Sequence, residues 1–97
     1  MDKELLAKEL LSEAAEETIR YSLKTKAPID DIVYDSCIEE GETIHIYVLF
    51  ETVEQLQTME EQKLKDGFMS VFIKYLTSHE FPFGQTPKLS FEFSIQL

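Results

Sequence analysis

The sequence has few of the residues that build covalent or metal-bound frameworks. Its 97 residues include one cysteine, Cys37, and no tryptophan. A single cysteine cannot form an internal disulfide, and a thiolate metal site needs several cysteines at short spacing. Nothing therefore argues for an oxidising compartment, and we expect a cytoplasmic protein that binds no metal and no other cofactor.

Glycines are equally scarce, and their positions argue against a nucleotide-binding loop. Gly41, Gly67 and Gly84 are the three glycines of the chain; they lie far apart, and none opens a predicted helix directly after a strand. A phosphate-binding loop needs glycines clustered at such a turn. The chain also lacks the G-x-S-x-G, H-E-x-x-H and spaced-aspartate patterns of hydrolase, zinc and calcium sites.

Basic residues are scarce in the middle of the chain. The net charge is −10, and residues 27 to 66 carry eleven acidic and only two basic residues. Residues 67 to 97 carry two of each and are neutral. Nucleic acid binding requires clustered cations, so we expect no nucleic acid partner. Two interpretations of the acidic middle remain open, a well-solvated surface and a docking face for a basic protein.

Long apolar runs are absent as well. No run approaches the roughly 18 residues of a membrane helix, and the first turns contain acids, so we predict neither a membrane span nor a secretion signal. Apolar residues nevertheless make up 43% of the chain. That content is enough for one domain, residues 1 to 97, with its own core.

Apolar spacing predicts two helices. Residues 2 to 25 repeat apolar positions every three or four residues and form an amphipathic helix that must pack on another element. Two Thr-x-x-Glu/Gln capping boxes then compete, at residues 52 to 55 and 58 to 61. We predict a short turn at the first box and the main helix from about residue 58, with Gly67 marking the close approach of another backbone.

Alternating residues predict three strands. Residues 31 to 38 and 43 to 51 form a hairpin through the loop Glu39-Glu40-Gly41, with Gly41 in the left-handed conformation. A three-residue loop opposes Asp35 to His45, whereas a two-residue loop would place Asp35 among isoleucines. Residues 88 to 97 form the third strand, whose apolar positions we expect to be buried; these are Leu89, Phe91, Phe93 and Ile95.

The order of these elements gives a fold. The two helices must cover the apolar face of the last strand, which predicts an α+β two-layer sandwich of order α-β-β-α-β, with two helices packed on one face of a three-stranded sheet. This order is similar to a reduced form of one of the KH arrangements. The nucleic acid contacts of that family depend on a G-x-x-G loop with basic flanks, and the chain has neither, so no residue of that family is assigned here.

Two groups of residues are candidates for protein binding. The acidic group comprises Asp30, Asp31, Asp35, Glu39, Glu40 and Glu42. The second group lies on the uncovered face of the hairpin and comprises Val33, Cys37, Tyr47 and Leu49. Scattered apolar surface residues are normal, but a contiguous patch indicates a partner or a second copy of the chain.

Histidines offer little chemistry. Asp35 opposite His45, with Cys37 diagonal to both, has the components of a thiol, imidazole and carboxylate set, although a cross-strand ion pair is the simpler interpretation. His79, which we place on the buried side of the second helix at its end, is expected to cap the last carbonyls.

Three functions follow from these features. The first is a small acidic binding protein, such as an inhibitor, an immunity-type protein or an adaptor, that binds a basic protein partner. The second is a homo-oligomeric structural module that self-associates through the hairpin face or a free strand edge. The third is a small enzyme; we expect no catalytic residue and no enzymatic activity.

Overall fold

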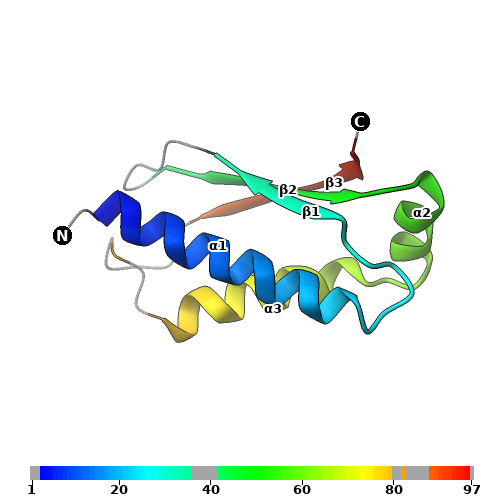
Figure 1. Ribbon diagram of the computed structural model, residues 1–97, viewed down its shortest axis with the longest axis horizontal. Helices are drawn as coiled ribbons and strands as arrows, with labels where there is room; N and C mark the ends of the chain where they lie inside the picture. The colour runs from blue at the N-terminus through cyan, green and yellow to red at the C-terminus, as the bar shows by residue number, and fades with distance from the viewer. Residues whose placement is uncertain (1–2, 36–41, 80–81, 83–87, 97) are drawn as a thin grey trace.

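The computed structural model describes residues 3–35, 42–79, 82 and 88–96, which contain three helices and a three-stranded sheet. Along the chain, the elements are α1 (Lys3–Ser22), β1 (Asp31–Tyr34), β2 (Ile44–Phe50), α2 (Val53–Glu61), α3 (Lys65–Ser78) and β3 (Leu89–Ile95). The strands form one layer, α1 and α3 pack together in a second layer beneath it, and α2 lies at one end (Figure 1). The α+β class and the three-stranded sheet are confirmed. The predicted order omits one helix, because the observed order is α-β-β-α-α-β.

The sheet is mixed, with β2 in its centre. β1 pairs antiparallel with β2 on one side, and β3 pairs parallel with it on the other. The hairpin register opposes Ile32 to Val48 and Tyr34 to Ile46, as predicted. The parallel pair needs a crossover connection, which α2 and α3 supply. The predicted loop at residues 39 to 41 lies outside the described residues.

The first of the two capping boxes begins a full helix. The Thr52 side chain accepts a hydrogen bond from the Gln55 backbone N–H at 3.2 Å, and the Gln55 side chain accepts one from the Thr52 N–H at 3.2 Å. These two bonds satisfy backbone donors that the first turn leaves free. Thr58 lies inside α2, where its hydroxyl donates to the Glu54 carbonyl. The predicted start of the main helix at residue 58 is therefore wrong.

A tight connection separates α2 from α3. Lys63 has a φ of 54°, in the left-handed region that side chains other than glycine rarely adopt. The Leu64 N–H then reaches back to the Met59 carbonyl at 3.0 Å, and α3 begins at Lys65. None of the helices within the described ranges is long and apolar enough to cross a membrane.

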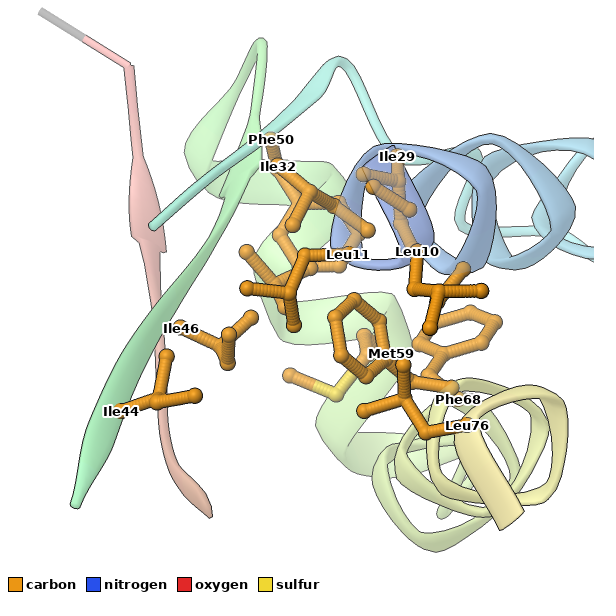
Figure 2. Packing of buried hydrophobic residues seen from close by; sticks show 14 of the residues in the cluster. Leu10, Leu11, Ile29, Ile32, Ile44, Ile46, Phe50, Met59, Phe68 and Leu76 are labelled. Atoms are coloured by element: carbon orange, nitrogen blue, oxygen red, sulfur yellow. The ribbon is translucent and has the colours of Figure 1, made fainter. Parts of the chain in front are cut away.

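The core lies between β2 and the two long helices. Leucines and alanines of α1 and large apolar residues of α3, among them Phe68 and Leu76, fill this space together with the inner side of β2 (Figure 2). Every inward-facing residue of β2 is at most 3% exposed; these residues are Ile44, Ile46, Val48 and Phe50. The Phe50 ring lies 6.5 Å from the ring of Phe68, and Met59 of α2 is fully buried.

Gly67 contacts a side chain rather than a backbone. A Cβ atom placed on Gly67 would meet the Tyr21 hydroxyl at 3.5 Å, which is ordinary van der Waals contact. The Tyr21 ring packs edge-on against the ring of Phe68, at 6.1 Å between centroids. The predicted backbone approach at Gly67 is therefore replaced by a contact between α1 and α3 through Tyr21.

The inward side of β3 is only partly covered. Its apolar residues, which we expected to be buried, are all half-buried; they are Leu89, Phe91, Phe93 and Ile95. Phe91 packs edge-on against Phe72 of α3 at 5.5 Å, whereas the Phe93 ring is approached by the Lys65 ammonium at 5.2 Å. The helices thus cover the centre of the sheet more completely than this edge.

Candidate functional site

One face of the sheet carries no helix in the described part of the chain (Figure 1). We call it the open sheet face. Side chains of a strand alternate between its two faces, and the helices cover the residues that include Ile32 and Ile46. The open sheet face therefore consists of Asp31, Val33, Asp35, His45, Tyr47, Leu49, Ser90, Glu92 and Ser94.

Apolar side chains occupy the middle of this face. The register places Tyr47 between Val33 on β1 and Glu92 on β3. Val33 is 41% exposed, and Tyr47 and Leu49 are half-buried. Tyr47 and Leu49 adjoin along β2, so the three residues form a contiguous apolar patch. Aromatic residues at the centre of a patch with a polar rim are typical of protein interfaces.

Carboxylates surround the apolar patch. Asp31 borders it on β1, Asp35 lies directly after the end of β1, and Glu92 borders it on β3. None of these three carboxylates forms an ion pair with another described residue. The three strands contain no lysine or arginine. A basic surface that docks here would therefore meet carboxylates without displacing an internal cation.

Asp35 contacts the backbone of His45 rather than its ring. The Asp35 carboxylate accepts a hydrogen bond from the His45 backbone N–H at 3.0 Å. This bond ends the β1–β2 ladder, because β1 stops at Tyr34. The predicted ion pair between the carboxylate and the imidazole is not formed among the described residues. Cys37, the third member of that set, lies outside them.

Of the remaining predicted residues, two lie within the described part of the chain and two lie outside it. Asp30 and Glu42 are exposed, one just before β1 and the other just before β2. The Asp30 backbone N–H donates to the Leu49 carbonyl at 2.8 Å, which ties the start of the hairpin to β2. Glu39 and Glu40 lie outside the described residues. The structure therefore brings Asp31, Val33, Asp35, Tyr47 and Leu49 together on one face.

Glu92 was missed as a site residue. Alternation placed it on the polar side of the last strand, but did not say which strand would lie beside it. Parallel pairing with β2 sets Glu92 directly against Tyr47. The charge of Glu92 thus belongs to the same surface as the acidic hairpin, although 45 residues of sequence separate it from Tyr47.

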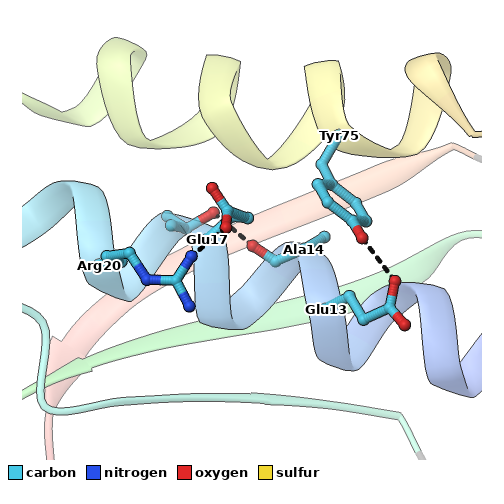
Figure 3. Close-up of polar contacts among 6 residues, drawn as sticks. Glu13, Ala14, Glu17, Arg20 and Tyr75 are labelled. Atoms are coloured by element: carbon cyan, nitrogen blue, oxygen red, sulfur yellow. Dashed lines mark hydrogen bonds and ion pairs between the residues drawn. The ribbon is translucent and has the colours of Figure 1, made fainter.

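A second polar cluster joins α1 to α3. The Tyr75 hydroxyl donates a hydrogen bond to the Glu13 carboxylate at 2.5 Å (Figure 3). This bond and the neighbouring negative charges raise the pKa of Tyr75 above its usual value. His79 stacks on Tyr75 at 4.2 Å and bonds the Tyr75 carbonyl through Nδ1 at 2.8 Å. The predicted capping role of His79 is confirmed, but its side chain is exposed rather than buried.

The polar cluster between α1 and α3 lies beside a small depression of the surface. A depression of about 230 Å³ beside Tyr75 is lined by Glu17, Lys74 and His79, among others. Glu17 is ion-paired with Arg20, as Figure 3 shows. Within the described ranges, no three histidine, cysteine, aspartate or glutamate side chains lie close enough together to hold a metal ion.

Comparison with known proteins adds no relative. No family model matches the chain, and neither a curated protein nor a solved structure matches it. The resemblance to a KH arrangement therefore remains one of element order alone.

Proposed function

We propose that the protein is a small acidic binding module, of the inhibitor, immunity or adaptor kind, that docks a basic protein on its open sheet face. The observation that supports this most directly is the contiguous patch of Val33, Tyr47 and Leu49, bordered by carboxylates that have no ion-pair partner among the described residues. The role is one of binding rather than catalysis.

The negative charge of the chain indicates that the partner is basic. The chain has a net charge of −10, so its field attracts a basic protein and accelerates the encounter. After the encounter, burial of Tyr47 and its apolar neighbours slows dissociation. The expected partner surface is an apolar patch surrounded by arginine or lysine side chains.

The test compares variants of the open sheet face with a matched charge variant elsewhere. Proteins encoded beside this chain in its genome are the first partners to titrate, by calorimetry at about 0.15 M and about 1 M salt, where the screening length falls from about 8 Å to about 3 Å. Tyr47→Ala removes the central aromatic side chain, and Glu92→Lys reverses the charge beside it. Glu16→Lys makes the same reversal at an exposed position of α1.

The expected results separate the open sheet face from a general effect of charge. Tyr47→Ala weakens binding by about thirtyfold or more, as a central aromatic residue does. Glu92→Lys weakens binding more than Glu16→Lys does, and high salt reduces the affinity of the unaltered chain. A partner that binds equally well to all three variants and at both salt concentrations would contradict the proposal.

A further inference from the structure

The outer edge of β3, residues Leu89–Ile95, is the least protected strand edge in the described part of the chain. β1, the other outer strand, has four residues, and its inward Ile32 is only 6% exposed. β3 has seven residues, no proline and no glycine, and a single charge, Glu92. Proteins usually protect an exposed edge by shortening it or by adding charges, prolines or bulges. We call this outer side of the strand the β3 edge.

The backbone of the β3 edge is ready to form another ladder. The Lys88 carbonyl accepts from the Ile44 N–H at 2.9 Å, and the Gln96 N–H donates to the Phe50 carbonyl at 2.8 Å. The even-numbered residues of β3 therefore direct their backbone N–H and C=O groups towards β2. In a strand these groups alternate sides, so the odd-numbered residues of β3 direct theirs outward. No described residue bonds to them.

The same odd-numbered residues leave apolar surface uncovered. Leu89, Phe91, Phe93 and Ile95 are half-buried, although each lies beside a fully covered residue of β2. A further strand at the β3 edge would bond the free backbone groups and cover these side chains at once. Burial of apolar surface and satisfaction of backbone groups thus favour the same contact.

The distribution of charge along the chain indicates which molecule pairs with the β3 edge. Residues 67 to 97 are neutral, whereas residues 31 to 51, which hold the hairpin, carry six acidic residues and no lysine or arginine. Two copies that met through their open sheet faces would oppose carboxylates, but two copies that met at the β3 edge would not bring the hairpins together. We propose that β3 pairs antiparallel with β3 of a second copy, joining two three-stranded sheets into one.

The position of Glu92 restricts the register. A two-fold axis at Glu92 would oppose two carboxylates directly, which is destabilising. An axis at Phe93 instead opposes Phe93 to its own copy, Phe91 to Ile95, and Glu92 to Ser94. Apolar side chains then face apolar side chains, polar side chains face polar ones, and no like charges are opposed. The proposed dimer is centred on Phe93.

The oligomeric state tests this proposal directly. Sedimentation equilibrium of the full chain, from low to high micromolar concentration, should give a mass that rises to twice the 11.3 kDa of one chain. Ile95→Pro removes one outward N–H per copy and keeps the extended backbone that proline tolerates at a strand edge. It should weaken dimerisation roughly thirtyfold relative to Ile95→Ala, which shortens the same side chain and keeps the N–H.

Charge variants test the register without touching the core. Ser94→Lys places an ammonium opposite Glu92 of the second copy and should strengthen the dimer by roughly two- to thirtyfold, because the pair occurs twice. Ser94→Glu should weaken it by a similar factor. Ser90→Lys adds the same charge to β3 but does not face Glu92 in this register, and it should have little effect.

Three outcomes would overturn the proposal. The first is a mass of one chain at every concentration. The second is a dimer that the two Ser94 variants leave unchanged, a result that decides the matter even where Ile95→Pro fails to fold. The third is a dimer broken by Tyr47→Arg but not by the Ser94 variants, which would assign self-association to the open sheet face. Binding of a basic partner is measured separately and does not depend on these results.

Discussion

β2 and β3 carry similar apolar patterns but occupy very different environments. Ile46 lies beside Phe91, and Phe50 lies beside Ile95, in one register on one face of the sheet. The β2 residues are fully buried, whereas their β3 neighbours are half-buried. A strand in the centre of the sheet has neighbours on both sides and helices beneath it. A strand at the edge has open space on one side, so the same side chains bury less surface and contribute less to stability.

This comparison assigns different tasks to the two strands. β2 supplies the centre of the core and, on its other face, the middle of the proposed binding surface. β3 closes one side of β2, brings Glu92 to Tyr47, and leaves a free edge. A truncation and matched substitutions can separate these two tasks.

Deletion of residues 88 to 97 should have the largest effect. Without β3, the backbone groups of β2 that bond Lys88 and Gln96 lose their partners, and one flank of the core opens. We expect the shortened chain to lose its cooperative thermal transition, as followed by circular dichroism and calorimetry. A truncated chain that melts cooperatively and stays monodisperse would show that the core does not need β3.

Two substitutions of the same type compare the strands directly. Phe50→Ala removes a ring that is 0% exposed and should cost about 3–5 kcal/mol of unfolding free energy. Phe93→Ala removes a half-buried ring and should cost about 1–2 kcal/mol, because only part of its transfer free energy is gained on folding. Urea denaturation measures both. Equal losses would mean that the edge strand contributes as much to the core as the central one.

The capping box before α2 gives a smaller effect. This helix contacts both β2 and β3, so a change at its start affects the support of both strands. Thr52→Ala removes the side chain that accepts from Gln55 and should cost about 1 kcal/mol. Thr58→Ala is the matched control, because Thr58 lies inside the helix and should change stability by less than about 0.5 kcal/mol. Equal effects in urea denaturation would argue against the cap.

The smallest expected effect lies in the helical layer on which β2 rests. The hydrogen bond to Glu13 raises the pKa of Tyr75, so folding favours the neutral phenol. The contribution of this contact to stability is therefore complete below pH 10.0 and is lost as the pH rises through the raised pKa. Glu13→Gln should return the pKa of Tyr75 towards its usual value.

NMR titration of isotope-labelled tyrosine rings measures this shift. Glu16→Gln, which removes a more distant carboxylate, should move the pKa of Tyr75 less than Glu13→Gln does. A pKa unaffected by Glu13→Gln would exclude the hydrogen bond as its main cause.

Local patterns predicted the first helix and the three strands, but not the division of residues 53 to 78 into α2 and α3. The alternation of residues 31 to 51 gave the hairpin register and, with it, the shared face of Val33, Tyr47 and Leu49. Local patterns alone favour both capping boxes, at Thr52 and at Thr58, because both have the required spacing. The first prevailed because Thr52 follows the end of β2, where the backbone is extended and its side chain is free to cap.

Which strand residues face inward follows from their local pattern, because a period of two is a property of the chain alone. The central place of β2, its parallel pairing with β3 and the half-burial of the inward β3 residues depend on tertiary contacts. Burial depends on what lies beside a strand, and neighbours distant in sequence are chosen by the packing of the whole chain. The open sheet face and the β3 edge both arise from that choice.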